Sequence, residues 1–466
     1  MSILNTHFGA DRIGEMLRGC KKIFFIGIGG VSMSSLALIT KRRGFDVAGS
    51  DRAKSAITDR LATSGVEVLY GHDGENVKGC DAVVYTLAIG EDNPEYVMAQ
   101  KLGIPAISRA DYLGYIMTGY RRRLGVSGMH GKSTCTGMCA AVFMAAESDP
   151  TVVSGASYAP MGGFYRIGNN ENFIFEACEY KDSFLDFCPT DAIVLNIEHE
   201  HVDYFPDLSS VCCSFSRFAA LTGEGGRIFY NADDENSAQT FENFGGKKIT
   251  FGINGKCDFS ARNIVTEMGR PSFDLFCGDA FLCRISLNVT GMHNVYNALA
   301  AASAAYECGI APEAIKKGLE DFCGIGRRME YRGALNGARV FDDYAHHPTE
   351  IEATLKGARE MTEGRLICAF QPHTYSRTKA LFDGFVSALS VADEVILAPI
   401  YAAREPNDPE VSSKRLALAI GERASACDAV DDLAKELKAR AKEGDTVIVM
   451  GAGDIDKVCT ILEYDK

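Results

Sequence analysis

The sequence predicts an α/β protein of three domains. Its length of 466 residues corresponds to about three domains at roughly 150 residues each. Short apolar runs without a helical period alternate with helical stretches in three successive segments, a pattern typical of parallel sheets covered by helices. In two of these segments a glycine-rich loop joins a strand to the following helix. We expect the domains at residues 1–120, 121–325 and 326–466.

The first segment begins with the apolar strand KKIFFI, which the turn GIGG joins to a helix ending near Gly44. The runs FDVAGSD, GVEVLYG and DAVVYTLAI continue the alternation. In the second segment the strand RRLGVS precedes another glycine loop and a long helix, and NFIFEACE and DAIVLNI provide further buried strands. Residues 225–290 contain short alternating runs, so we expect a small extra sheet there, mixed or antiparallel. The third segment alternates again, with the strands RVFDDYA, RLICAFQP, DEVILAPI and DTVIVMGAGDI.

Charge and cysteine content restrict the class of function. The net charge of −14 argues against a nucleic-acid binder or an anionic-membrane binder, which usually needs a basic surface. The sixteen cysteines form no CxxC pair, and the first residues, MSILNTHFGADR, lack an apolar signal segment. We therefore expect a cytoplasmic protein with free thiols and no structural zinc.

The first glycine loop, Gly27–Ser32, resembles the dinucleotide fingerprint G-x-G-x-x-G. Ser32 stands in place of the third glycine, and Asp51 supplies the acid expected about 20 residues later. Glycines let backbone N–H groups approach a pyrophosphate at a helix N-terminus, so the loop predicts a Rossmann-like domain that binds a diphosphate-containing nucleotide. The alternative is a tight strand-to-helix turn without a ligand.

The second loop, Gly128–Thr134, keeps the GKS core of a P-loop but not the strict spacing, because Val126 stands where the first glycine belongs. Lys132 can neutralise phosphate charge and Ser133 can ligate Mg²⁺. The loop therefore predicts a P-loop ATPase-like central domain. Two phosphate loops imply two phosphorylated ligands, as expected of an ATP-driven synthetase that acts on a nucleotide-linked substrate.

Acidic residues follow the strands next to this loop. Glu176 and Glu179 come directly after NFIF, where a Mg²⁺ ligand is expected near a P-loop, although a solvated strand end is the alternative. Two histidines and three acids lie between Glu198 and Asp203, which suggests a metal or acid–base cluster, or a merely polar loop. Mg²⁺ is the better candidate beside a triphosphate, although the composition also allows zinc. Asn294 and Asn297 begin a helix and can either cap it or contact an adenine edge.

The third segment presents polar side chains at the carboxyl ends of two strands, where α/β sheets place ligands. They belong to the runs Asp342–Pro348 and Phe370–Thr378. Arg327 and Arg328 lie at the expected junction between domains, and such arginines suit phosphates and carboxylates.

Together these motifs resemble the Mur ligases of peptidoglycan synthesis. The resemblance covers the whole chain in order and rests on the blocks GIGGVSMS, GMHGKST, EACEY, NIEHEHVDYF, GMHNVYNALA, GRRMEYRG, DDYAHHPTE and FQPHTYSRT. The pair DDYAHHP and FQPHTYSRT points to the alanine-adding member. The resemblance implies a C-terminal Rossmann-like domain and an ATP- and Mg²⁺-dependent ligase. Such an enzyme adds L-alanine to the lactyl carboxylate of UDP-N-acetylmuramate through an acyl phosphate and works as a monomer or homodimer.

The resemblance also implies roles for individual residues. Catalysis is expected at Lys132, His201, His346, His373 and Arg377. ATP is expected at Gly128, His130, Gly131, Lys132, Ser133, Thr134, Asn294, Asn297, Arg327 and Asp343, with the metal ions at Ser133, Glu176 and His201. The UDP-linked substrate is expected at Gly27, Gly29, Gly30, Val31, Ser32, Met33, Ser34, Asp51, His72 and Arg109. The amino acid is expected at Tyr344, His346, His373 and Arg377.

The chain departs from the family pattern at several of these blocks. Met129 and Ser133 replace threonines, Thr374 stands where arginine is common, and Gly90 stands where lysine is common. His199-Glu200 replaces Pro-Asp, which leaves open which side chains complete the second metal site. Three rival functions also remain at this point: a ligase that joins a whole peptide to the muramate, a nucleotide-dependent dehydrogenase, and a scaffold with a decayed P-loop.

Overall fold

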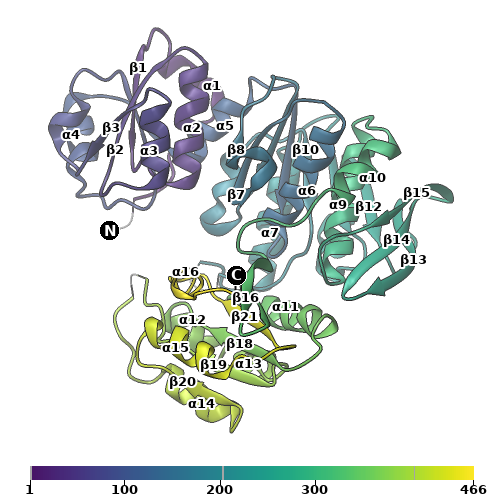
Figure 1. The fold of residues 1–466 in the computed structure, drawn as a ribbon. Coiled ribbons are helices and arrows are strands. Elements are labelled where there is room, and N and C mark those ends of the chain that lie inside the picture. The colour runs from purple at the N-terminus through teal and green to yellow at the C-terminus, as the bar shows by residue number, and fades with distance from the viewer. Residues whose placement is uncertain (1–2, 202–203, 404, 466) are drawn as a thin grey trace. The chain divides into compact units, whose positions relative to one another are not determined.

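Three β-sheets follow one another along the chain in the computed structural model, which describes residues 3–201, 204–403 and 405–465 (Figure 1). They confirm the predicted α/β architecture. By their contacts, the residues divide into two compact units. One unit comprises residues 1–260, 276–282 and 296–318, and the other comprises residues 261–275, 283–295 and 319–466.

The N-terminal sheet is fully parallel, with the strand order β3-β2-β1-β4-β5. Strand β1 is the point from which the chain continues to both sides, and such a switch point favours ligand binding beyond the strand ends. The strands are β1 Lys22–Ile26, β2 Asp46–Asp51, β3 Glu67–Tyr70, β4 Ala82–Tyr85 and β5 Ala106–Ser108. The helices are α1 Ala10–Met16, α2 Val31–Arg42, α3 Ala56–Thr63, η1 Gly74–Val77, α4 Pro94–Leu102 and α5 Arg109–Met117.

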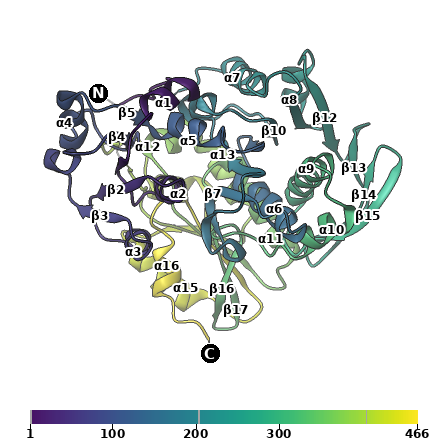
Figure 2. The same ribbon diagram turned by 90° about the horizontal axis from the view of Figure 1, so that it is seen from above.

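The apolar runs of this sheet are buried, as expected of strands covered on both faces. Ile23, Phe24, Phe25 and Ile26 of β1 have no solvent exposure. Their side chains alternate between two apolar clusters, because successive residues of a strand point to opposite faces. Helix α2 also packs against β7 and β8 of the next sheet, as Figure 2 shows.

The central sheet contains the run β12-β11-β10-β6-β9-β7-β8. Strand β6 lies between β10 and β9 and leads directly into the second glycine loop and α6. The strands of this run are β6 Arg122–Ser127, β7 Thr151–Tyr158, β8 Gly163–Arg166, β9 Asn172–Glu176, β10 Asp191–Val194, β11 Arg227–Asn231 and β12 Lys247–Gly252. The helices are α6 Lys132–Ala145, η2 Ala159–Met161, η3 Tyr180–Asp186, α7 Leu208–Ala220 and α8 Glu235–Phe241.

The range 225–290 contains strands, as predicted, but the first two are not part of a separate mixed or antiparallel sheet. Strand β11 pairs in parallel with β10, and β12 pairs in parallel with β11, so both strands extend the central sheet. Helix α7 lies between β10 and β11, and helix α8 lies between β11 and β12. These helices supply the crossovers that parallel pairing requires. Further elements follow at β13 Phe259–Glu267, β14 Arg270–Cys277, β15 Ala280–Ser286, α9 His293–Glu307 and α10 Pro312–Glu320.

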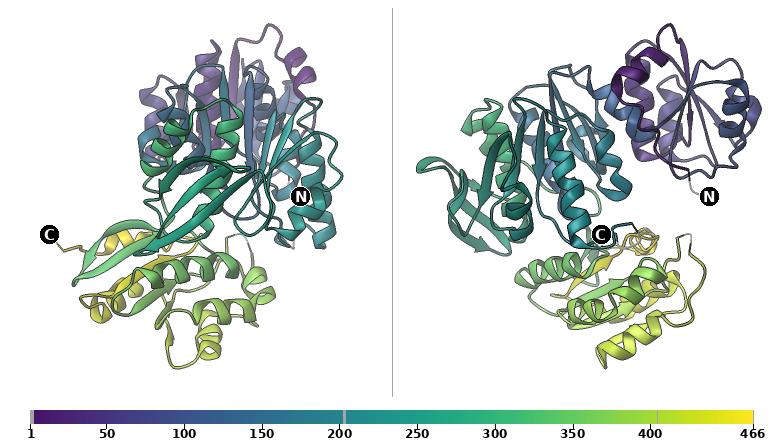
Figure 3. Two further views of the ribbon diagram at one scale, coloured as in Figure 1. Left: turned by 90° about the vertical axis from the view of Figure 1, so that its right-hand side faces the viewer. Right: turned by 180° about the vertical axis from the view of Figure 1, so that it is seen from behind.

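The C-terminal sheet has the order β16-β17-β21-β18-β19-β20, and only β16 pairs antiparallel within this order. Helices α11, α13 and α14 contribute to one apolar cluster and α15 and α16 to another, so helices cover both faces (Figure 3). The strands are β16 Glu330–Leu335, β17 Ala338–Asp343, β18 Leu366–Phe370, β19 Glu394–Leu397, β20 Ala424–Ala426 and β21 Thr446–Met450. The helices are α11 Pro348–Glu360, α12 Tyr375–Ala380, α13 Phe382–Leu389, α14 Ser413–Ile420, α15 Val430–Arg440 and α16 Lys457–Ile461.

Within residues 3–201, 204–403 and 405–465, no helix combines the length and the apolar character that crossing a bilayer requires.

Candidate functional site

The first glycine loop connects β1 to α2 through backbone that a side chain would disturb. Gly27 has φ +79°, and a Cβ there would lie 2.8 Å from Cγ2 of Thr86. The N–H of Gly29 donates to Oδ2 of Asp51 at 2.8 Å, so the acid at the end of β2 fixes the loop. Gly30 is the N-cap of α2 and has no side chain to cover the helix N-terminus. The loop therefore has the geometry of an anion-binding turn.

Arg109 reaches this loop from the start of α5. Its Nη1 donates to Oγ of Ser32 at 3.1 Å, so two residues predicted to contact the same ligand lie side by side. Burial lowers the pKa of Arg109. Met33 and Ser34 differ from the rest of the predicted set because their side chains face the core, with 2% and 3% exposure. If they contact a ligand, they do so through the backbone.

His72 belongs to a hydrogen-bonded network around a buried acid that the sequence analysis did not identify. Nδ1 of His72 lies 2.7 Å from Oε2 of Glu95, which has no solvent exposure. Ser50 donates to the same oxygen at 2.7 Å, and Asn76 donates to Oε1 at 2.7 Å. Glu95 is part of α4, far from any motif, so only the three-dimensional structure reveals that it orients His72.

Asn196 supports the second glycine loop through two hydrogen bonds, a role that the sequence did not reveal. Oδ1 of Asn196 accepts from the N–H of His130 at 2.9 Å, and Nδ2 donates to the carbonyl of His130 at 3.1 Å. Gly128 and Gly131 adopt φ of +134° and +84°. A Cβ at Gly131 would lie 2.6 Å from Oδ1 of Asn297, which places this predicted ATP contact beside the loop.

Lys132 is the first residue of α6, and its ammonium group is enclosed by oxygen atoms. Nζ donates to the carbonyls of Gly128 and Met129 at 2.6 and 2.9 Å and lies 3.0 Å from Oε2 of Glu179. Burial lowers the pKa of Lys132, but Glu179 and other acids outweigh this effect and raise it. Burial alone would raise the pKa of Glu179. The charge of Lys132 and the hydrogen bond from His201 have the larger effect and lower this pKa to about 2. Both groups are therefore charged at neutral pH.

Three oxygen-bearing side chains around Lys132 fit a divalent cation. Glu176 ends β9 and accepts from the N–H of Gly155 through Oε2 at 2.9 Å, which leaves Oε1 without that bond. Glu179 contributes a fully buried carboxylate, and Ser133 contributes a hydroxyl from the first turn of α6. Carboxylates and a P-loop hydroxyl are hard oxygen donors of the kind that Mg²⁺ prefers. These donors therefore fit the predicted Mg²⁺. Glu179 is a further candidate ligand beside the predicted Ser133, Glu176 and His201.

His201 takes part in this cluster through Glu179. Its Nε2 lies 3.0 Å from Oε1 of Glu179, and its ring lies 4.8 Å from that of Tyr180. Glu200, which replaces the usual aspartate, is buried with 7% exposure. His199 instead faces the carbonyl of Phe205 at 3.1 Å, so it does not join Glu179. Asp203 lies outside the described residues.

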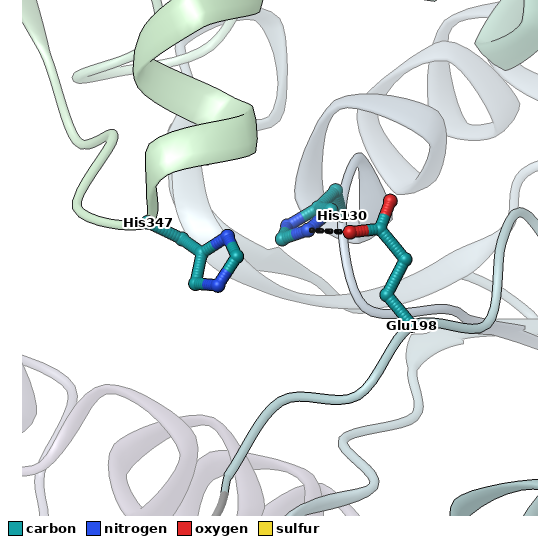
Figure 4. Close-up of side chains that lie close together, drawn as sticks. All are labelled: His130, Glu198 and His347. Atoms are coloured by element: carbon teal, nitrogen blue, oxygen red, sulfur yellow. Dashed lines mark ion pairs between the residues drawn. The ribbon is translucent and has the colours of Figure 1, made fainter. Parts of the chain in front are cut away.

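His130 pairs with an acid from the loop after β10. Its Nε2 lies 3.5 Å from Oε2 of Glu198, and Figure 4 shows this ion pair. Asn196 and Glu198 lie in the same segment between β10 and α7. This segment therefore contacts the second glycine loop at two points.

In the C-terminal unit, Arg327 and Asp343 organise the backbone near the end of β17. Nη2 of Arg327 donates to the carbonyl of Gly451 at 2.7 Å, and its guanidinium lies 5.1 Å above the ring of Tyr344. Asp343 accepts from the N–H groups of Ala345 and Met329 at 2.9 and 2.8 Å. Both carboxylate oxygens of Asp343 therefore hold the two loops in place.

Asn294 of the same unit donates through Nδ2 to the carbonyl of Thr290 at 2.8 Å. The amide thus bonds the turn that precedes α9. This bond favours the predicted structural alternative for Asn294, while Asn297 lies against Gly131 as described above.

The residues predicted to surround the amino acid form a row of aromatic rings. The rings of Tyr344 and His346 lie 5.5 Å apart, and those of His346 and His373 lie 6.1 Å apart. Burial, followed by the charges of His346 and Arg377, lowers the pKa of His373 to about 4. The structure thus brings Tyr344, His346 and His373 together and places Arg377 close enough to act on the same ring.

Three family models cover most of the chain. The Mur ligase family catalytic domain matches residues 22–121, the Mur ligase middle domain matches residues 126–305, and the Mur ligase glutamate ligase domain matches residues 327–453.

Curated relatives and solved structures agree with these matches. The UDP-N-acetylmuramate–L-alanine ligase of Clostridium novyi is 44% identical over 441 residues, covering 94% of this chain and 96% of the relative. The protein of the same name from Caldicellulosiruptor saccharolyticus is 44% identical over 449 residues, covering 96% and 98%. The UDP-N-acetylmuramate-alanine ligase structure from Thermotoga maritima has a TM-score of 0.80 at 27% identity, covering 94% and 97%. A murein peptide ligase from Psychrobacter arcticus has a TM-score of 0.72 at 25% identity, covering 95% and 98%.

Proposed function

The chain belongs to the Mur ligase family, and on this premise we propose that it joins L-alanine to the lactyl carboxylate of UDP-N-acetylmuramate at the expense of ATP. The observation that carries the proposal is the enclosed Lys132, which starts α6 in a glycine loop and faces the carboxylate of Glu179 at 3.0 Å. A buried lysine at this place suits a nucleoside triphosphate. The 44% identity to two ligases of that name over nearly the whole chain supports the choice of substrates.

We assign one ligand to each of the three expected domains, 1–120, 121–325 and 326–466. The uridine diphosphate is assigned to the first glycine loop with Asp51, His72 and Arg109. ATP is assigned to the second loop, with Asn294, Asn297, Arg327 and Asp343 as further contacts. The amino acid is assigned to Tyr344, His346, His373 and Arg377. We also propose that the chain works as a monomer or homodimer.

The chemistry needs activation of a carboxylate, because attack by an amine on the free carboxylate would require oxide as leaving group. An oxygen of the lactyl carboxylate attacks the γ-phosphorus of ATP, the bond from that phosphorus to the bridging oxygen breaks, and ADP leaves. The amine of L-alanine, after loss of a proton, attacks the carbonyl carbon of the acyl phosphate. The nitrogen of the tetrahedral intermediate loses a further proton, and the intermediate expels inorganic phosphate to leave the amide.

The residues of this chain contribute mainly position and charge, as phosphoryl transfer requires. The ammonium group of Lys132 neutralises phosphate oxygens, and backbone N–H groups at the start of α6 bind others. Ser133, Glu176 and His201 are assigned to the metal ions, with Glu179 as an added ligand, and a bound Mg²⁺ would neutralise charge that develops on the phosphates.

The test is ADP release by the purified chain with UDP-N-acetylmuramate, ATP and a panel of amino acids that includes glycine and L-serine. We expect release that requires both UDP-N-acetylmuramate and an amino acid and is fastest with L-alanine. The expected product has the mass of UDP-N-acetylmuramate plus L-alanine minus one water. Release with an L-alanyl peptide but not with L-alanine would instead identify a peptide-joining ligase. The names of the relatives at 44% identity do not favour that alternative.

A further inference from the structure

Tyr401 and His373 are joined by both backbone and side-chain contacts. His373 follows β18 and Tyr401 follows β19, and the two loops form a parallel bridge beyond the ends of their strands. Thr374 donates to the carbonyl of Tyr401 at 2.8 Å, and Tyr401 donates to the carbonyl of Pro372 at 2.9 Å. The two rings are stacked, with centroids 5.5 Å apart and an interplanar angle of 25°. The position and the plane of the His373 ring are therefore set by Tyr401.

The packing around Tyr401 restricts this stack further. A Cβ on Gly453, in the loop after β21, would lie 2.8 Å from Cβ and Cγ of Tyr401. The tyrosine thus occupies the space that the glycine leaves. The ring of His346 also lies near the imidazole, with centroids 6.1 Å apart. Contacts with two neighbouring rings restrict the rotation of the imidazole.

The two nitrogens of His373 are in different environments. Nδ1 is enclosed and makes no hydrogen bond with any of the described residues. An enclosed N–H without an acceptor is rarer and costlier than an enclosed lone pair, so the ring hydrogen belongs on Nε2. His373, which is only partly buried, can therefore offer Nε2–H as a donor to a ligand.

The side chains around His373 include the permanent cation Arg377, which can meet an anionic group of a ligand beside the Nε2–H donor. The side chains that act on His373 are His346 after β17, Arg377 of α12, and Tyr401 and Glu405 after β19. Burial is the largest influence on the pKa of His373, which lies at about 4, so the ring is neutral at pH 7 and its tautomer matters. Glu405 is held by the N–H and the hydroxyl of Ser376, at 2.9 and 2.5 Å, and keeps its negative charge, while Arg377 is a permanent cation that acts on the same ring.

We propose that Tyr401 is a positioning residue that holds His373 so that its Nε2–H donates to the carboxylate of the amino-acid substrate. The inference rests on the proposed function and deepens it, since it states which end of the amino acid His373 recognises. The stack needs an aromatic ring and not the hydroxyl, so Tyr401→Phe preserves it and Tyr401→Ala removes it.

The kinetic test compares these two variants with L-alanine and with L-alaninamide, which lacks the carboxylate. For Tyr401→Ala we expect at least a tenfold loss of kcat/KM with L-alanine. With L-alaninamide we expect a loss of no more than about twofold, and the KM values for ATP and the nucleotide substrate should stay within twofold. Tyr401→Phe should stay within twofold throughout. Equal losses with both amino substrates, or Tyr401→Phe as impaired as Tyr401→Ala, would overturn the proposal.

A spectroscopic test needs no turnover and separates this inference from the proposed function. In the full chain with isotopically labelled histidine, the ¹⁵N shifts of His373, assigned by comparison with His373→Gln, should report the Nε2–H tautomer in the wild type. Tyr401→Ala should mix the two tautomers and raise the pKa of His373 towards its ordinary value of about 6.5. An Nδ1–H tautomer in the wild type, or unchanged shifts and titration in Tyr401→Ala, would overturn the inference. Failure of the wild type to use L-alanine would overturn the proposed function and leave this readout intact.

Discussion

Nζ of Lys132 lies 3.0 Å from Oε2 of Glu179, and both side chains are largely enclosed, with 14% and 1% exposure. A buried ion pair stabilises little by itself, yet breaking it by removing one partner leaves a buried charge without compensation. The same lysine is the one that would meet the phosphates of ATP. Its partner Glu179 therefore compensates the charge of the ammonium group while the loop holds no nucleotide.

Replacement of Lys132 by alanine should abolish ADP release, with a loss of at least about a thousandfold, because the phosphates lose their main protein cation. The variant also removes the ammonium partner of the buried Glu179, which keeps its contact with His201, and we expect its free energy of unfolding to fall by roughly 3 kcal/mol. The measurements are ADP release and denaturant unfolding. Lys54→Ala is the matched control, because Lys54 pairs with Asp59 in an exposed ion pair and should change neither quantity appreciably. Activity of Lys132→Ala near that of the control would refute the role of the loop.

Asn196→Asp should separate the two bonds that this side chain makes to His130. The carboxylate keeps an acceptor for the N–H of His130 but loses the donor to its carbonyl, and it places a new charge near Glu198. We expect the KM for ATP to rise about tenfold and the KM for L-alanine to stay within twofold. Initial rates at varied ATP measure this directly. An unchanged KM for ATP would mean that the loop keeps its shape without the amide.

Gly27→Ala should weaken binding of the nucleotide-linked substrate through a steric clash that a second substitution can relieve. The added Cβ meets Cγ2 of Thr86 at 2.8 Å, and alanine is also disfavoured at φ +79°. We expect the KM for UDP-N-acetylmuramate to rise at least tenfold, as measured from initial rates. The double variant Gly27→Ala/Thr86→Ser removes the opposing methyl group and should recover part of the loss. No recovery would assign the defect to the backbone conformation alone.

Asp342 makes the stability of the C-terminal unit depend on pH in an identifiable direction. Burial raises its pKa to about 6, although Arg327 and Arg332 lower it. Since this value lies above that of the unfolded chain, the folded state holds the proton more tightly. The contribution of the protonated Asp342 side chain to stability is fully present below about pH 4 and is lost as the pH rises through 6. The full effect amounts to about 3 kcal/mol.

The measurement is the difference in unfolding free energy between the wild type and Asp342→Asn at several pH values, without ligands. The wild type should lose stability relative to the variant as the pH rises from 4 to 7. A difference that does not change with pH, or that changes with the opposite sign, would refute the raised pKa.

Sequence patterns predicted those parts of the molecule that depend on neighbouring residues. Strands such as β1 and β18 were predictable because a strand buried on both faces is a continuous apolar run. The two loops were predictable because glycine, helix start and lysine or serine must be adjacent for an anion to bind. The parallel pairing of β11 with β10 and of β12 with β11 was not predictable, because short alternating runs do not specify a partner strand.

The supporting residues were not predictable, because each acts across a long stretch of chain. Glu95 contacts His72 from helix α4, Asn196 contacts His130 over 66 positions, and Tyr401 stacks on His373 from the loop after β19. None of these three residues lies within the motif that it supports. Glu179 was noted beside Glu176 in the sequence, but its pairing with Lys132 joins residues 47 positions apart and could not be seen in the sequence.

The central claim is that an oxygen of the muramate carboxylate attacks the γ-phosphorus of ATP before the amide forms. UDP-N-acetylmuramate labelled with ¹⁸O in the lactyl carboxylate tests this most directly, with mass analysis of the phosphate released in the presence of ATP and L-alanine. The proposed chemistry predicts one ¹⁸O atom in each phosphate and one retained in the amide carbonyl. Phosphate without ¹⁸O, formed together with ADP and the alanyl product, would contradict an acyl-phosphate route.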